Sequence, residues 1–316
     1  VDVILNAEAS GASFAVQEVI RESGTLCLHT VSETSSLTAD PSIRAWNAFR
    51  FSRIGIHDAV GSAKYAAEIA KGKGLKTWMS VNPDYAYGRD SDDTFFWALK
   101  KFSPGFEIIG KGWPKIFQPD YTEVITQIAR AKPDAIYTSL WGGDLVSFID
   151  QALLYGIFKN TELFAINLAD YTTMSAVKNL PKGLHSATRY VAAWPNTQDN
   201  RDYDKSYTDI YGDHPTNWSW EASVGIDYLI NALKETRSTD TKKLAEAIKG
   251  KTRKSFMGVG DGNTVSIREK DQTIVDYSIG WGTTISNEPY MTGIQGADWN
   301  TIKELENEWL TDKGWL

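Results

Sequence analysis

The chain has 316 residues, 42% of them hydrophobic, and this length exceeds one comfortable hydrophobic core, so we expect two compact lobes. The net charge is −7, from 33 Lys and Arg against 40 Asp and Glu, and no basic cluster is dense enough to neutralise a run of phosphates. We therefore expect no nucleic-acid partner. The longest apolar runs are of strand length, so we also expect no membrane insertion.

Metal and disulfide chemistry have little support in the sequence. Cys27 is the only cysteine, so no disulfide can form within the chain. The histidines His29, His57, His185 and His214 lie far apart, and a zinc site would have to join them with scattered carboxylates. We expect neither a metal nor any other cofactor.

From the start of the chain to about residue 194, short β-branched or aromatic runs alternate with segments of helical period. The expected strands are residues 1–5, 25–29, 75–81, 106–111, 134–139 and 163–166. The expected helices are residues 12–23, 58–71, 91–102, 121–131 and 144–155. Parallel strands covered on both faces are apolar throughout, so the alternation predicts an α/β fold of parallel sheets flanked by helices.

The pattern changes after Trp194 and Pro195, where helical segments dominate. The expected helices are residues 199–211 and 218–236, a shorter one ending near residue 250, and a terminal one at 299–311. Residues 264–268 and 272–281 predict short antiparallel strands, and the alternating glycines of 258–262 predict a hairpin turn rather than a dinucleotide site. This succession indicates a chain that crosses between its two lobes more than once.

Polar loops that begin helices follow several of the expected strands, at the edge where open α/β sheets bind ligands. Residues 6–11 place the Ser10 hydroxyl and backbone N–H groups where a carboxylate would be held, and residues 32–36 repeat the arrangement. Capping of the helix by Ser10 is an equally good interpretation. Residues 84–88 and 141–144 add aromatic rings at two further strand ends.

The chain has 12 tryptophans, roughly three times the usual share of a globular protein. Trp78 and Trp97 fall in an expected strand and an expected helix, and we assign them to the core. Trp141 instead lies in a strand-end loop, followed by two glycines, where a large ring has little packing role. We expect it to stack on a ligand, and we expect Asp144 to cap the helix that follows.

Sequence signatures of catalysis are absent, with neither a G-x-S-x-G nor an H-E-x-x-H motif. Cys27 lies in an apolar strand, which favours an inert core residue over a nucleophile. Gly105, Gly110 and Lys111 fit the spacing of a phosphate-binding loop, but residues 106–109 are typical of a strand, which argues against one. We expect no enzymatic activity.

Several short motifs occur in a particular order along the chain. They are an apolar first strand with Ser10-Gly11, a Ser/Thr-rich loop ending in Leu37-Thr38, Phe49-Arg50, residues 84–88, and Lys132-Pro133-Asp134. In order and spacing they resemble the branched-chain-amino-acid type of periplasmic solute-binding protein over nearly the whole chain. The resemblance implies the type I periplasmic binding fold: two α/β lobes, three crossovers, and ligand in an interlobe cleft that closes.

The resemblance also implies lobe boundaries. Lobe I would comprise residues 1–50 and 195–255, and lobe II would comprise residues 51–194 and 256–316. Members of the family begin with a strand, a long helix and a further strand before the point at which Val1 stands. We therefore expect an N-terminally incomplete chain that lacks the first strand-helix-strand of lobe I and carries no signal peptide.

The resemblance implies ligand-binding residues in both lobes, namely Ser10, Ser32, Glu33, Thr34, Tyr87, Trp141 and Asn167. Those of lobe I would bind the ligand carboxylate, and the two aromatic residues of lobe II would contact the rest of the ligand. Amino-acid binders place a carboxylate for the ligand ammonium at the position of Asn167, whereas here the acid Asp170 comes slightly later. An aromatic acid or another amine-free solute therefore competes with an amino acid.

The role implied by the resemblance is the substrate-binding component of an ABC importer. Such a protein is periplasmic or otherwise extracytoplasmic and delivers its small-molecule ligand to an inner-membrane permease, and a cleft that must close favours a monomer. Two alternatives stay open: a ligand-sensing domain of a receptor or regulator and, from a different class, a hydrolase of small amides or esters with Ser10 as nucleophile and His29 as base.

Overall fold

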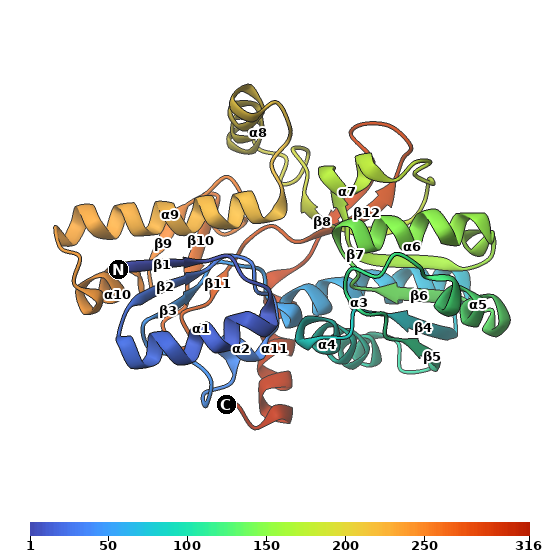
Figure 1. Ribbon diagram of the computed structural model, residues 1–316, viewed down its shortest axis with the longest axis horizontal. Coiled ribbons are helices and arrows are strands. Elements are labelled where there is room, and N and C mark those ends of the chain that lie inside the picture. Colours follow the sequence, from blue (N-terminus) through green and yellow to red (C-terminus); the bar gives the residue numbers. More distant parts are fainter. The chain divides into compact units, whose positions relative to one another are not determined.

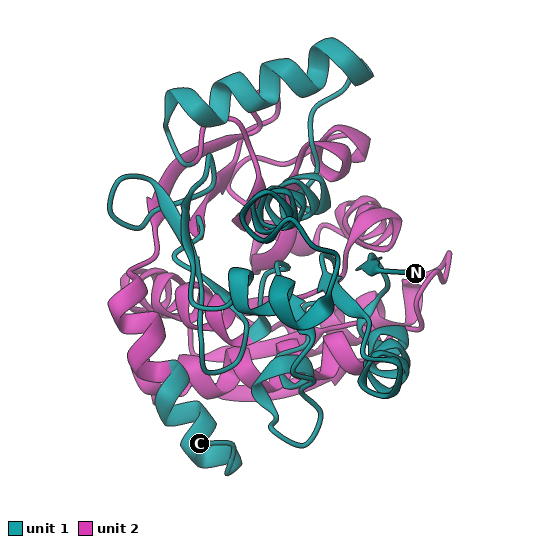
Figure 2. Ribbon diagram, turned by 90° about the vertical axis from the view of Figure 1, so that its left-hand side faces the viewer, with its two compact units in different colours: residues 1–55, 195–278, 306–316 teal, residues 56–194, 279–305 magenta.

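In the computed structural model, which describes residues 1–316, the chain divides into two compact units (Figure 2). Unit 1 comprises residues 1–55, 195–278 and 306–316, and unit 2 comprises residues 56–194 and 279–305. The chain changes unit after residues 55, 194, 278 and 305, and the last change lies within helix α11 (Trp299–Lys313). The second change falls at Trp194 and Pro195, where the sequence pattern changes.

The division differs from the expected lobes at residues 51–55, 256–278 and 306–316, which belong to unit 1. Residues 256–278 stay with unit 1 because β10 (Thr264–Ile267) pairs antiparallel with both β9 (Thr252–Lys254) and β11 (Ile274–Val275). A parallel bridge joins Thr273 to Arg50 within the same unit. Residues 306–316 are held there by Arg268, which donates to Glu306 at 2.8 Å.

Unit 1 is built on a parallel sheet of three strands in the order β1-β2-β3, which are Val3–Asn6, Leu26–His29 and Ala48–Arg50. Its helices are α1 (Ser10–Ser23), α2 (Ser36–Ala39), α8 (Gln198–Tyr211), α9 (Asn217–Thr236) and α10 (Thr241–Ile248). Helix α1 lies on one face of the sheet and α9 on the other (Figure 1). Every residue of β2 and β3 is buried, as expected for strands covered on both faces.

Unit 2 is built on a sheet of seven strands in the order β13-β12-β8-β7-β6-β4-β5. In chain order these strands are β4 (Thr77–Val81), β5 (Glu107–Gly112), β6 (Ala135–Thr138), β7 (Glu162–Asp170), β8 (His185–Tyr190), β12 (Gly280–Thr284) and β13 (Met291–Gly296). The strands from β8 to β5 are parallel, and β12 and β13 add an antiparallel edge.

The helices of unit 2 cover both faces of this sheet. They are α3 (Gly55–Lys73), α4 (Ala86–Phe102), α5 (Thr122–Ala131), α6 (Gly142–Leu154), α7 (Tyr171–Ala176) and the short 3-10 helix η1 (Ile157–Lys159). Helices α3 and α4 lie on one face, and α6 and α7 lie on the other (Figure 1). The predicted α/β class, with mainly parallel sheets between helices, is confirmed.

The structure corrects one strand and confirms one turn. The expected strand at 272–281 is wrong, because it contains β11 and the start of β12, which belong to different sheets. Asp276 has a φ of 61°, a left-handed conformation that ends β11. The glycines of 258–262 connect the antiparallel strands β9 and β10, as predicted. None of the helices combines the length and hydropathy that a membrane-spanning segment needs.

Candidate functional site

Three of the residues predicted to bind a ligand carboxylate meet in unit 1. Ser10 Oγ accepts a hydrogen bond from Ser32 Oγ and another from the backbone N–H of Thr34, each at 3.3 Å. All three residues are buried. Because Ser10 Oγ is the acceptor in both bonds, its own O–H can still donate to a ligand.

Capping of helix α1 by Ser10, the alternative interpretation, is wrong. Ala9 is the N-cap of α1 and makes no side-chain capping bond, and Ser10 is the first helical residue. The first N–H groups of a helix have no partner within it. No acidic residue lies in the first turn of α1. The positive end of the helix is therefore not neutralised by its own side chains, which suits an anion.

Arg50 holds the loop of residues 32–34 from behind. Its guanidinium is fully buried and donates to the carbonyl oxygen of Thr34 at 2.6 Å and to that of Ser32 at 2.7 Å. A further bond runs from Nε to Ser52 Oγ at 3.2 Å. Both loop carbonyl oxygens thus accept hydrogen bonds from Arg50. These bonds fix the loop conformation that brings the Thr34 N–H to Ser10. Sequence reasoning used Arg50 only as part of a motif and missed this role.

Glu33 points toward helix α9 in unit 1. The amide Nδ2 of Asn217 donates to Glu33 Oε1 at 3.4 Å and to Glu221 Oε1 at 3.2 Å. Glu221 in turn accepts the backbone N–H of Arg53 at 2.8 Å. Glu33 is therefore part of a buried network that ties its loop to the start of α9. Direct contact of Glu33 with a ligand stays a prediction.

His29 cannot serve as a base for Ser10, so the structure contradicts the catalytic pair of the hydrolase alternative. Its Nδ1 lies 2.7 Å from Asn6 Nδ2, and its Nε2 lies 2.9 Å from Gln17 Oε1. Nδ1 thus accepts and Nε2 donates, and both nitrogens are occupied. Burial, with a smaller contribution from the charge of Arg50, lowers the pKa of His29 to about 3. Cys27 is buried, which confirms a core residue, and burial raises the pKa of its thiol to about 12.

Unit 2 brings four aromatic rings together, at the carboxyl ends of β4 and β6 and in the loop after β5. We call Tyr85, Tyr87, Phe117 and Trp141 the aromatic cluster. The indole Nε1 of Trp141 donates to Tyr85 OH at 3.1 Å, and the Phe117 ring meets the Trp141 ring edge-on with centroids 5.9 Å apart. The rings of Tyr85 and Tyr87 are 6.0 Å apart. Phe117 is 72% exposed, so part of the cluster faces outward.

Sequence reasoning named Tyr87 and Trp141 as binding residues, included Tyr85 only as part of the loop of residues 84–88, and missed Phe117. The signal for Tyr85 was present, since it lies in the same strand-end loop as Tyr87. Phe117 has a φ of 61° and carries no sequence signal beyond its aromatic ring.

Asn167, near the carboxyl end of β7, is buried beside the aromatic cluster. Its Nδ2 donates to Tyr87 OH at 2.9 Å, to the carbonyl oxygen of Ser139 at 2.9 Å and to that of Leu140 at 3.2 Å. Because two of these partners are carbonyl oxygens, the orientation of the amide is fixed. The side-chain oxygen Oδ1 accepts none of these bonds and is the polar atom left for a ligand.

The acids near this position are engaged by protein donors. Asp170 caps α7 and accepts bonds from the N–H and Oγ1 of Thr172 at 3.2 and 2.7 Å. The prediction that Asp144 caps α6 is wrong, because Trp141 is the N-cap and makes no side-chain capping bond. Asp144 Oδ2 instead accepts the backbone N–H of Phe117 at 2.9 Å and so holds that loop against α6.

Gly88 fixes the turn that presents Tyr85 and Tyr87. A Cβ at this position would lie 1.9 Å from the carbonyl oxygen of Pro83, so no other residue fits without a change of backbone. Glycine is therefore required where the loop of residues 84–88 enters helix α4.

Two α/β units that carry polar loops and aromatic rings at the carboxyl edges of their parallel sheets define a ligand-binding protein of two lobes. The sequence model of the family described as "Periplasmic binding protein" matches residues 1–280. The chain belongs to this family of extracytoplasmic proteins, and its role is to bind a substrate. A comparison with curated proteins found no match.

Solved structures of solute-binding proteins share the fold. One, from Rhodopseudomonas palustris BisB5 in complex with 3,4-dihydroxybenzoic acid, is 21% identical with a TM-score of 0.82, over 94% of this chain and 79% of the other. A periplasmic binding protein from Burkholderia mallei is 18% identical with a TM-score of 0.81, over 96% and 78%. The leucine-, isoleucine-, valine-, threonine- and alanine-binding protein of Brucella ovis is 18% identical with a TM-score of 0.75, over 94% and 77%.

Proposed function

We propose that the chain is the substrate-binding component of an ABC importer and that its ligand is a hydroxylated aromatic carboxylate. The observation that carries the proposal is the neutral amide of Asn167, which lies beside the aromatic cluster where an amino-acid binder would need an acid. The amide cannot balance the charge of a ligand ammonium. Asp170, the acid that follows it, is engaged as the cap of α7.

The ligand carboxylate is assigned to unit 1. The Ser10 hydroxyl and the first N–H groups of α1 supply donors, and the first turn of α1 adds no negative charge. Arg50 and Ser52 keep the loop in the conformation that these donors need. Ser32 and Thr34 support Ser10 through their bonds to it.

The ligand ring is assigned to unit 2. Trp141 and Tyr87 offer the faces and edges on which an aromatic ring packs. A ring hydroxyl would donate to Asn167 Oδ1, the acceptor that the protein itself leaves unused. An aliphatic side chain would pack on the same rings but would cover this acceptor without pairing it, which costs about 1–3 kcal/mol.

The solved relatives include both kinds of ligand. Structures from R. palustris are described in complex with 3,4-dihydroxybenzoic acid, benzoate and 4-hydroxybenzoate, whereas the Brucella ovis protein is named for aliphatic amino acids. The choice made here rests on Asn167 and the aromatic cluster, and the aromatic-acid relatives support it. We propose further that the protein is not an enzyme, acts as a monomer, and passes its ligand to a permease unchanged.

The test is thermal melting of the chain with 4-hydroxybenzoate, 3,4-dihydroxybenzoate, benzoate, leucine and valine. A ligand at about a hundred times its Kd adds about 2.7 kcal/mol, which raises the Tm by several degrees. We expect the largest shift with the hydroxylated acids, a smaller one with benzoate, and none with the amino acids. A shift with leucine or valine and none with the benzoates would overturn the proposal. Recovery of the ligand unchanged by mass spectrometry separates binding from hydrolysis.

A further inference from the structure

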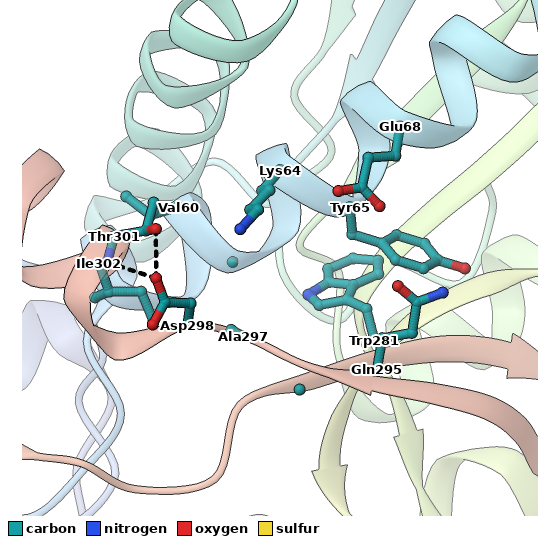
Figure 3. Close-up of a pocket in the computed structure, with 12 residues that line it drawn as sticks. Val60, Lys64, Tyr65, Glu68, Trp281, Gln295, Ala297, Asp298, Thr301 and Ile302 are labelled. Atoms are coloured by element: carbon teal, nitrogen blue, oxygen red, sulfur yellow. Dashed lines mark hydrogen bonds between the residues drawn. The ribbon is translucent and has the colours of Figure 1, made fainter.

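A cavity lies in unit 2 and shares no residue with the candidate site. Helix α3, strands β12 and β13, and the first turn of α11 enclose a volume of about 150 Å³ (Figure 3). Its polar lining residues are Lys64, Tyr65, Glu68, Trp281, Gln295, Asp298 and Thr301.

Trp281 brings an unused hydrogen-bond donor to this cavity. The side chain is 1% exposed, and its Nε1 has no hydrogen-bond partner. The indole stacks on Tyr65 with centroids 5.6 Å apart, and its nitrogen faces the side of the cavity on which Lys64 lies (Figure 3). The hydroxyl of Tyr65 donates to His185 Nδ1 at 2.9 Å and makes no hydrogen bond with the indole nitrogen. A buried N–H without a partner is unfavourable, so an acceptor bound in the cavity would stabilise this arrangement.

Two opposite charges line the same cavity without pairing. Lys64 and Glu68 stand one turn apart on α3, and neither forms an ion pair or a hydrogen bond. A lysine four residues before a glutamate is the less favourable order for a pair on a helix. Both charges are therefore open to a ligand that carries the complementary pair.

Asp298, the other acid of the lining, is already engaged. It accepts the backbone N–H groups of Asn300 and Thr301 at 3.2 and 3.1 Å and the Thr301 hydroxyl at 2.6 Å. The bonds from Thr301 and Asn300, with the charge of Lys64, lower the pKa of Asp298, so the group stays ionised. A polyvalent anion would meet this carboxylate and that of Glu68, which argues against phosphate or sulfate as the occupant.

We propose that this cavity binds a small zwitterion, an amino acid of about the size of glycine. Its carboxylate would accept from Trp281 Nε1–H and face Lys64, and its ammonium would face Glu68. The volume fits such a molecule, since a cavity of about 150 Å³ holds a ligand as small as benzene. This site is separate from the aromatic-carboxylate site proposed above, and neither proposal depends on the other.

The test follows the indole N–H resonance of Trp281 in the ¹⁵N-labelled full chain, assigned by its loss in Trp281→Phe, while glycine is added. The protein is first saturated with 4-hydroxybenzoate, so that the candidate site is occupied. We expect the indole N–H resonance to shift until the site is saturated with glycine. Lys64→Met and Glu68→Gln should each lower the affinity for glycine about tenfold. Lys71→Met, an exposed lysine on the same helix outside this cavity, is the matched control and should bind as the wild type does. Acetate carries only the carboxylate of glycine and methylammonium carries only its ammonium, so each should bind at least about tenfold more weakly than glycine.

Three results would overturn the proposal. The first is the absence of a saturable shift, which would indicate that the cavity holds only water. The second is equal glycine affinity in Lys64→Met, Glu68→Gln and the control, and the third is acetate binding as tightly as glycine, which would show that Glu68 does not contact the ligand. If Trp281→Phe does not fold, the lysine and glutamate variants still decide the matter, because both side chains lie on the helix surface. These readouts do not change if the aromatic-carboxylate proposal fails, because the Trp281 resonance reports on this cavity alone.

Discussion

The polar loops of unit 1 and the aromatic cluster of unit 2 are held in place by different means. In unit 1, Ser10 and Thr34 are buried, and the charged Arg50 behind them fixes the loop through two carbonyl oxygens. In unit 2, Trp141 and Phe117 are partly exposed: their rings contact each other, Trp141 Nε1 donates to Tyr85 OH, and Asp144 accepts the backbone N–H of Phe117.

Under the proposed function, this difference separates two tasks. Donors that bind a carboxylate must keep their positions, so they are built into the hydrogen-bond network that also stabilises the unit. Rings that select the rest of a ligand need only a surface on which to pack. We therefore expect substitutions behind the polar loops to change stability and substitutions in the aromatic cluster to change affinity.

The largest effect is expected from Arg50→Met. The substitution keeps most of the side-chain volume but removes the buried donor of the Thr34 carbonyl oxygen and one of the two donors of the Ser32 carbonyl oxygen, which keeps only the Ser52 hydroxyl, at about 1–3 kcal/mol for each lost bond. We expect the free energy of unfolding, measured with urea, to fall by about 3 kcal/mol or more. Arg44→Met, an arginine of the same unit without these contacts, should change it by less than about 0.5 kcal/mol. Equal losses in the two variants would contradict the role given to Arg50.

Acid should weaken unit 1 before unit 2. The pKa of His29 falls from 6.5 in the unfolded chain to about 3 in the folded protein, so its stabilising contribution is complete above pH 6.5 and is lost as the pH falls toward 3. At about pH 5 the loss is about 2 kcal/mol. In unit 2, bonds from His185 and Lys73 lower the pKa of Glu162 from 4.5 to about 2, so that contribution is lost only below pH 4.5.

Hydrogen exchange of the β2 and β7 amides at about pH 7 and pH 5, corrected for the intrinsic effect of pH, measures this difference. We expect protection to fall in β2 and to hold in β7. In His29→Gln, the change in β2 should be smaller. Equal sensitivity of the two strands to acid would show that His29 does not set the stability of unit 1 in this range.

Trp141→Ala should weaken binding of a hydroxylated aromatic acid about tenfold, because the substitution removes a stacking surface and the partner of Tyr85 OH. Isothermal titration calorimetry with 4-hydroxybenzoate measures the effect. Trp46→Ala, an exposed tryptophan of unit 1, is the matched control and should leave the affinity unchanged. If both variants bind equally well, Trp141 does not contact the ligand.

The smallest effect is expected from Ser10→Ala. One neutral donor to the carboxylate is lost while the helix N-terminus remains, so the affinity should fall about threefold to fivefold. Ser23→Ala, at the exposed end of the same helix, should bind as the wild type does. A loss in Ser10→Ala as large as that in Trp141→Ala would mean that the hydroxyl, rather than the ring surface, dominates binding.

The sequence predicted most of the α/β pattern because buried parallel strands are apolar throughout and their helices keep a regular period. It missed β8 because His185, Thr188 and Arg189 in this strand are polar. They are nevertheless buried, since their side chains form hydrogen bonds with other buried groups. It named Ser10 as a candidate binding residue but could not decide between capping and a loop contact, since both use the same hydroxyl. The role of Arg50 depends on carbonyl oxygens distant in the chain, and no local pattern records them.

The close approach of Gly88 to Pro83 sets a rule for redesigning this protein's selectivity. A combinatorial library could vary Tyr85, Phe117 and Trp141 together, because Trp141 contacts both of the other side chains. It must keep Gly88, since any Cβ there would lie 1.9 Å from a backbone oxygen. With Gly88 kept, the backbone of the turn stays unchanged, and the ligand preference can be altered by the choice of side chains alone.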